Sequence, residues 1–169
     1  MTANGVSPMA IPGTRGGQYT ADGLTHAENA NPTSGAVDHL KQLDKRRDKL
    51  DKFNYGDHWA TVEGKGDLVV LTWGSLTNTA REAIGRAAAD GIDVRLVAPR
   101  LLAPVQPDRL AAALKGAKRI LVVEQTHGSQ FHKYLRAHYD LPAPVKVFNR
   151  PGPLPITAGE IHYAIAEWR

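Results

Sequence analysis

The chain has 169 residues, a formal net charge of +4 and no cysteine. This length fits one domain with an additional segment. The lack of cysteine excludes disulfides, thiol catalysis and cysteine-bound zinc or iron–sulfur clusters within the chain. The densest basic run, Lys45 to Lys52, is interleaved with aspartates. We interpret it as a solvated helix face and expect no nucleic-acid partner.

The sequence also lacks the features that direct a chain to a membrane. No apolar stretch approaches the roughly 20 residues of a membrane span. The amino terminus has no apolar core of the signal-peptide kind. We therefore expect no membrane partner and a cytoplasmic location.

The first 35 residues are dominated by Gly, Pro, Thr, Asn and Ser. Such a stretch buries too little apolar surface to fold by itself. Phrases such as Ser7–Gly13 are too specific for a flexible linker, so we predict an ordered loop that packs on a neighbour. Thr25, His26 and Glu28 gather in this loop. They are either ligand contacts or ordinary exposed loop residues.

A helix is predicted next, over Ala36 to about Asp51. Val37, Leu40 and Leu50 lie at helical spacing among mostly charged residues. Because this apolar stripe is thin, the pattern indicates a connecting helix that lies on a surface.

Strand and helix patterns alternate from His58 to Arg169. An edge strand is predicted near 59–63, and further strands are predicted at 68–72, 93–98, 119–124 and 145–148. Helices of ordinary length separate the later strands, which predicts right-handed parallel crossovers. The fold class is therefore α/β, a three-layer α/β/α sandwich.

Three local signals mark the helix starts in this region. Pro107 suits the first turn of a helix that runs through Leu114. Thr79 with Glu82, and Thr157 with Glu160, have the spacing of capping boxes. Both pairs are therefore predicted to lie at helix amino termini.

Two strands end in similar polar turns that contain glycine. The first turn contains Gly74 and Ser75; the second contains Glu124, Gln125, His127 and Gly128. In parallel sheets, ligands and partners bind at the carboxyl ends of strands. The first turn either holds an anion or is a tight turn with Ser75 or Thr77 helping to cap the helix. Glu124 either makes internal hydrogen bonds to a neighbouring turn or contacts a partner domain or ligand.

No strong catalytic motif is present. The histidines lack the spacing of metal ligands, so we expect no metal site. A hydrolase built on Ser75, His127 and Glu124 would need adjacent strands and outward side chains, and Ser75 lacks the Gly-x-Ser-x-Gly elbow.

A series of short phrases, in order, covers nearly the whole chain. They are Asn4–Gly13, Gly17–Glu28, Lys45-Arg46, Leu71–Ser75, Arg100–Pro104, Ile120–Gln125 and Arg150–Gly152. On these phrases the chain resembles the carboxyl-terminal part of the α subunit of 2-oxoacid:ferredoxin oxidoreductases, especially of the 2-oxoglutarate type. The family often has Gly-Leu-Glu-His where this chain has Gly23-Leu-Thr-His26, which puts any role for Thr25 in doubt.

The resemblance implies a domain organisation. Residues 1–35 would be the tail of a preceding pyrimidine-binding domain, residues 36–57 a connecting helix and linker, and residues 58–169 a transketolase carboxyl-terminal-like domain. That domain would have about five strands, mostly parallel, with one antiparallel edge strand.

The resemblance also implies a function. The complete complex would decarboxylate a 2-oxoacid, form an acyl-CoA and pass electrons to ferredoxin, using thiamine diphosphate, Mg²⁺, an iron–sulfur cluster and CoA. Because most of the pyrimidine-binding domain is missing, we expect a split or truncated subunit. Such a chain would bind no cofactor alone and would not be active alone. Its partners would be the remaining α-subunit domains, the β subunit and, indirectly, ferredoxin. The alternative is a free-standing small-molecule-binding α/β domain.

Overall fold

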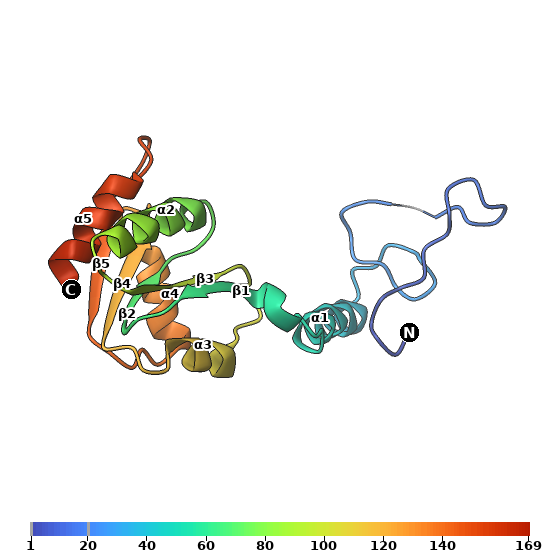
Figure 1. The fold of residues 1–169 in the computed structure, drawn as a ribbon. Coiled ribbons are helices and arrows are strands. Elements are labelled where there is room, and N and C mark those ends of the chain that lie inside the picture. The colour runs from blue at the N-terminus through green and yellow to red at the C-terminus, as the bar shows by residue number, and fades with distance from the viewer. Residues whose placement is uncertain (1, 20) are drawn as a thin grey trace. The chain divides into compact units, whose positions relative to one another are not determined.

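The computed structural model describes residues 2–19 and 21–169. Met1 and Thr20, which belong to the predicted segment 1–35, lie outside the described residues. The chain forms two compact units, one ending at Asn54 and the other covering Tyr55–Arg169 (Figure 1). Each unit is described by itself below.

The described residues of the amino-terminal unit form a loop followed by helix α1 (Ala36–Asp51), whose limits were predicted correctly. Within the loop, His26 and Pro32 form an isolated antiparallel bridge. Backbone hydrogen bonds on both sides of the bridge, from Ala27 N to Asn31 O and from Thr33 N to Thr25 O, are each 2.9 Å long. The loop is therefore ordered around the polar cluster that contains Thr25, His26 and Glu28.

No residue of α1 is buried. Val37 is 81% exposed, Leu40 60% and Leu43 46%. The apolar stripe of this helix therefore covers no core within the described residues of the amino-terminal unit. Among the described residues, no helix is both long and apolar enough to cross a membrane.

The carboxyl-terminal unit is a five-stranded sheet with helices on both faces (Figure 1). The strand order is β1-β3-β2-β4-β5; β1 pairs antiparallel with β3, and the other pairs are parallel. The predicted fold class is confirmed, including the antiparallel edge strand. The elements are η1 (Gly56–Trp59), β1 (Ala60–Gly64), β2 (Leu68–Leu71), α2 (Leu76–Ala89), β3 (Val94–Pro99), α3 (Pro107–Leu114), β4 (Arg119–Glu124), α4 (Gln130–His138), β5 (Val145–Asn149) and α5 (Ala158–Trp168).

Alternate residues of the central strands serve two separate cores, as the twofold period of a strand requires. Val70 and Leu121 pack with α2 and α5 on one face. Val69 and Val122 pack with α3 and α4 on the other face. All four side chains are fully buried. Apolar residues on both faces explain why these strands are continuous apolar runs in the sequence.

One of the two predicted capping boxes is wrong. Thr157 and Glu160 form the predicted box at the start of α5. Helix α2, however, begins at Leu76, so Thr79 and Glu82 lie inside it. Gly74, with φ +61°, turns the chain in the loop between β2 and α2 and lets the helix start earlier than the side-chain pattern indicated.

Candidate functional site

Strands β2 and β4 are neighbours in the sheet, with Leu71 beside Val122. The chain leaves β2 towards β3 on one side and later returns to place β4 on the other side. This reversal is a topological switch point, where open α/β sheets bind ligands beyond the strand ends. The two turns singled out in the sequence therefore lie at one edge of the sheet.

Glu124 is the last residue of β4 and is fully buried. Its Oε2 accepts hydrogen bonds from Thr126 Oγ1 at 2.6 Å and from Phe131 N at 2.9 Å. Its Oε1 accepts from His132 N at 2.9 Å. Both amides belong to the first turn of α4, so the carboxylate caps that helix from the strand and lies at the positive end of its dipole. Of the two interpretations of Glu124 given above, these contacts match internal hydrogen bonds to a neighbouring turn.

Gln125 continues the same network towards the loop before α5. Its Nε2 donates to Leu154 O at 3.1 Å, and its Oε1 accepts from Ile156 N at 3.3 Å. Asn149 Nδ2 at the end of β5 donates to Thr126 O at 3.0 Å. The second turn is thus fixed by side-chain amides on both sides.

The first turn is more open. Ser75 is the N-cap residue of α2 but makes no side-chain cap hydrogen bond. Thr77 Oγ1 instead donates to Gly74 O at 2.8 Å. Trp73 is 41% exposed, and its ring centroid lies 6.0 Å from that of Phe131. Gly74, Ser75 and His127 are exposed beside this aromatic pair.

The geometry does not form a hydrolytic triad. The oxygens of Glu124 are engaged by Thr126 and the α4 backbone rather than by His127. Within residues 2–19 and 21–169, no group of three or more His, Asp or Glu side chains could hold a metal ion. The strand-end surface therefore presents an aromatic pair and turn backbone rather than a catalytic constellation.

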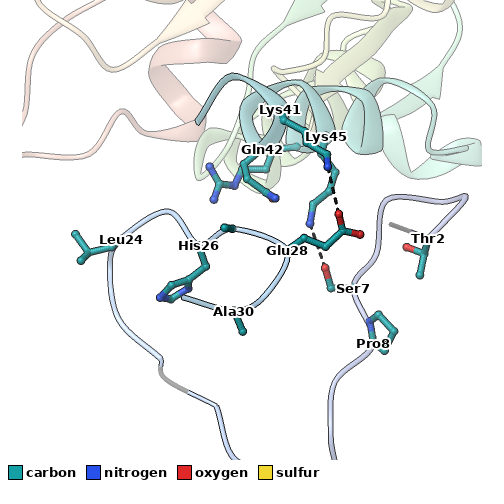
Figure 2. A pocket seen from close by; sticks show the side chains of 12 residues that line it. Thr2, Ser7, Pro8, Leu24, His26, Glu28, Ala30, Lys41, Gln42 and Lys45 are labelled. Atoms are coloured by element: carbon teal, nitrogen blue, oxygen red, sulfur yellow. Dashed lines mark hydrogen bonds and ion pairs between the residues drawn. The ribbon is translucent and has the colours of Figure 1, made fainter. Parts of the chain in front are cut away.

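A cavity of about 600 Å³ lies in the amino-terminal unit, between α1 and the preceding loop. Figure 2 shows Lys41, Gln42 and Lys45 of α1 on one side, with His26, Glu28 and Ser7 of the loop opposite. The full lining is Thr2, Ser7, Pro8, Leu24, His26, Ala27, Glu28, Ala30, Lys41, Gln42, Lys45 and Arg46.

Two side-chain contacts join α1 to the preceding loop at the cavity. Lys41 Nζ lies 3.3 Å from Glu28 Oε2, and Lys45 Nζ donates to Ser7 Oγ at 3.1 Å (Figure 2). His26 and Glu28 therefore face the cavity, whereas Thr25 lies outside its lining, with Oγ1 3.3 Å from His39 Nδ1.

The lysines and Arg46 of the cavity were not expected to belong to a site. Lys45 and Arg46 belong to the basic run that was interpreted as a solvated helix face, and Lys41 lies one turn before that run. In the sequence, only the spacing of these three cations along α1 distinguishes them from the other cations of the helix. Lys41 and Lys45 are four residues apart and so share one helix face, and Arg46 follows Lys45 directly. Only the fold of the loop shows that this face is covered.

Residues 57–163 match the family model described as the transketolase, C-terminal domain. The chain is 28% identical over 141 residues to the 2-oxoacid:ferredoxin oxidoreductase subunit alpha of Saccharolobus solfataricus, covering 80% of this chain and 22% of that protein. It is 33% identical over 67 residues to the 1-deoxy-D-xylulose-5-phosphate synthase of Geobacillus thermodenitrificans (strain NG80-2), covering 40% of this chain and 11% of that protein.

Among solved structures, the chain is similar to the 2-oxoglutarate:ferredoxin oxidoreductase from Magnetococcus marinus, solved with 2-oxoglutarate, coenzyme A and succinyl-CoA bound. The TM-score is 0.74 and the identity 30%, over 98% of this chain and 29% of that chain. A split gene transketolase, an inactive β4 tetramer, shares the fold, with TM-score 0.51 and 20% identity over 69% of this chain and 43% of that chain. The chain thus spans between a fifth and a third of the oxidoreductase chains that it matches.

Proposed function

Because the chain belongs to the transketolase C-terminal domain family, we propose that it is an assembly domain of a larger thiamine-diphosphate-dependent oxidoreductase. The enzyme would be a cytoplasmic 2-oxoacid:ferredoxin oxidoreductase of the 2-oxoglutarate type, and the chain would form part of its α subunit. The observation that carries the proposal is the 30% identity to the Magnetococcus marinus enzyme over 98% of this chain. That match includes the amino-terminal loop and α1, whereas the family model matches only residues 57–163 of this chain.

The chemistry of the complete enzyme would be supplied by other domains. An iron–sulfur cluster needs cysteine thiolates, and this chain has none. The described residues hold no cluster of acidic or histidine side chains suited to Mg²⁺. The residues present therefore do not fit these cofactors, and we assign the chain no step of the reaction and no activity alone.

Two surfaces support a role in assembly. The first is the apolar stripe of α1, where Val37, Leu40 and Leu43 stay exposed. A contiguous exposed apolar surface marks a contact site for protein. We propose that the remainder of the α subunit covers it, in keeping with the part of the oxidoreductase chains that this chain does not span.

The second surface is the strand-end edge, with Gly74, Ser75, Gln125, His127 and Gly128. We propose that these residues face the pyrimidine-binding domain and the β subunit. The buried Glu124 fixes the turn between β4 and α4 through its hydrogen bonds to the α4 backbone. The exposed Trp73 ring beside Phe131 gives the edge an aromatic contact, a side-chain type that is common at the centre of interfaces.

Co-expression tests the proposal. The chain should co-purify with polypeptides that carry the missing pyrimidine-binding domain and the cluster-binding β subunit. The purified complex should reduce ferredoxin in the presence of 2-oxoglutarate and CoA, and the chain alone should not.

A matched pair of variants identifies the surface. Val37→Glu with Leu40→Glu places charge on the apolar stripe and should abolish co-purification. Lys49→Glu changes charge on another face of the same helix and should leave the complex intact. A chain that stays monomeric beside these polypeptides and melts at a higher temperature with a small ligand would instead support the free-standing binding domain.

A further inference from the structure

The cavity between α1 and the amino-terminal loop has the size and chemistry of a ligand site. Its volume of about 600 Å³ falls within the roughly 300–1,000 Å³ typical of small-molecule pockets. We propose that it binds a small molecule that carries a phosphate or diphosphate group. The inference stands on the amino-terminal unit alone and does not depend on the proposed assembly.

The charges of the cavity are unbalanced. Three cations, Lys41, Lys45 and Arg46, line it together with one carboxylate, Glu28. Glu28 pairs with Lys41, while the described contact of Lys45 is to the neutral hydroxyl of Ser7. The cavity therefore carries an excess of positive charge that an anion would neutralise.

Other cations of the same helix are balanced by acids. Arg47 Nη1 lies 3.0 Å from Asp44 Oδ1, and Arg47 Nη2 lies 3.2 Å from Asp48 Oδ1. Lys52 Nζ lies 3.0 Å from Asp48 Oδ2. Neither Arg47 nor Lys52 lines the cavity. The helix thus pairs these two cations away from the cavity, whereas Lys45 and Arg46 have no carboxylate partner among residues 2–19 and 21–169.

The donor set favours phosphate. A guanidinium offers a planar fork of N–H donors that matches phosphate oxygens, and an ammonium adds a point charge. Ser7 adds a hydroxyl donor. Nε2 of His26 is buried without a hydrogen bond among the described residues; its 3.3 Å approach to Asp22 Oδ1 is an ion-pair distance only. That ring nitrogen is a further group that a ligand would satisfy.

The apolar residues that line the cavity indicate what the uncharged part of the ligand contacts. Pro8, Leu24, Ala27 and Ala30 give the cavity an apolar side. A bare phosphate, which is only a few ångströms across, leaves most of 600 Å³ unfilled. The ligand is therefore an organic phosphate whose uncharged part lies against these residues.

Calorimetric titration of the 169-residue chain with inorganic pyrophosphate at low ionic strength tests the proposal. We expect saturable binding with one site per chain. Lys45→Gln with Arg46→Gln should weaken it at least about tenfold, because two charge-assisted contacts are lost. Lys115→Gln, at an exposed position of the carboxyl-terminal unit, should change it less than about twofold. An absence of saturable binding, or equal weakening by Lys115→Gln, would overturn the proposal.

A second measurement uses the unaltered chain, in case the double variant fails to fold. Bound pyrophosphate should protect the Lys45 amine from acetylation, measured by mass spectrometry, and should leave the exposed Lys115 of the carboxyl-terminal unit reactive. Equal reactivity of Lys45 with and without a saturating concentration would also overturn the proposal. Because neither measurement uses another subunit, failure here leaves the co-purification result unaffected.

Discussion

At the scale of single residues, Glu124 shows how a buried charge is used in this fold. The N-cap residue of α4, Ser129, has left-handed φ of +52° and makes no side-chain cap hydrogen bond. Glu124 replaces that cap by accepting from the amides of Phe131 and His132. The carboxylate thus ties the end of β4 to the start of α4 and fixes the turn between them.

We predict that Glu124→Gln destabilises the chain by about 1–3 kcal/mol, because the new NH₂ group faces backbone donors and leaves a buried amide unsatisfied. Chemical denaturation measures the free energy of unfolding. Glu82→Gln is the matched control: this carboxylate, 60% exposed, pairs with Arg86 on the helix surface, and its loss should cost less than about 1 kcal/mol. Equal effects of the two variants would contradict the capping role of Glu124.

The sequence shows that a carboxylate at the end of an apolar strand needs partners, but it does not identify them. The partners of Glu124 are mainly backbone amides seven and eight residues further on. Backbone amides have no signature in the sequence. The sequence alone therefore fits both internal hydrogen bonds and contact with a partner, and the position of α4 decides for the internal hydrogen bonds.

At the scale of elements, the two capping-box patterns show when a local sequence pattern is enough to predict where a helix begins. Thr157 and Glu160 follow a proline-containing loop, so nothing upstream competes for the start of α5. Thr79 and Glu82 follow Gly74, whose positive φ already allows a helix to begin at Leu76. The pattern is the same in both cases, and the turn before it decides whether it lies at a helix end.

The box at α5 has a consequence for acid stability. A hydrogen bond from the Thr157 backbone, with further bonds from Arg150 and the Thr157 hydroxyl, lowers the pKa of Glu160 from 4.5 to about 2. A carboxyl whose pKa is lower in the folded state stabilises the fold fully above its unfolded pKa. That stabilisation is lost as the pH falls from about 4.5 towards 2.

We therefore predict that Glu160→Gln lowers the melting temperature at pH 6 and that the difference from the unaltered chain disappears as the pH falls from 4.5 to 2. Thermal melting followed by circular dichroism at a series of pH values measures it. Glu82→Gln serves again as a control for the loss of one carboxylate. A difference from the unaltered chain that stays constant across this pH range would show that the carboxylate of Glu160 does not stabilise α5.

At the scale of the whole molecule, the carboxyl-terminal unit was predictable and the cavity was not. Continuous apolar strands such as Leu68–Leu71 and strong helix periods specify a three-layer sandwich, and the resemblance found in the sequence is confirmed by the comparisons. The strand order and the cavity depend on contacts between distant segments, for example Lys45 with Ser7. Such contacts leave no periodic trace in the sequence.

The last prediction concerns unequal stability within the chain. Residues Val69–Leu71 of β2 and Ile120–Glu124 of β4 are fully buried, whereas no residue of α1 is buried. Amides of a buried strand exchange hydrogen only when the core unfolds, and those of an exposed helix exchange through local opening. We expect the protection factors of α1 to be at least about a hundredfold lower than those of β4. Hydrogen exchange followed by mass spectrometry measures both.

The same measurement on the assembled complex tests what covers α1. An isolated helix of about 15 residues is marginal in water, so α1 depends on packing to persist. If the remaining α-subunit domains cover Val37 and Leu40, exchange of α1 should slow on assembly, while that of β4, already buried, should change little. If α1 is already as protected as β4 in the free chain, the helix does not need an external partner. In that case its exposed stripe would no longer support the assembly role.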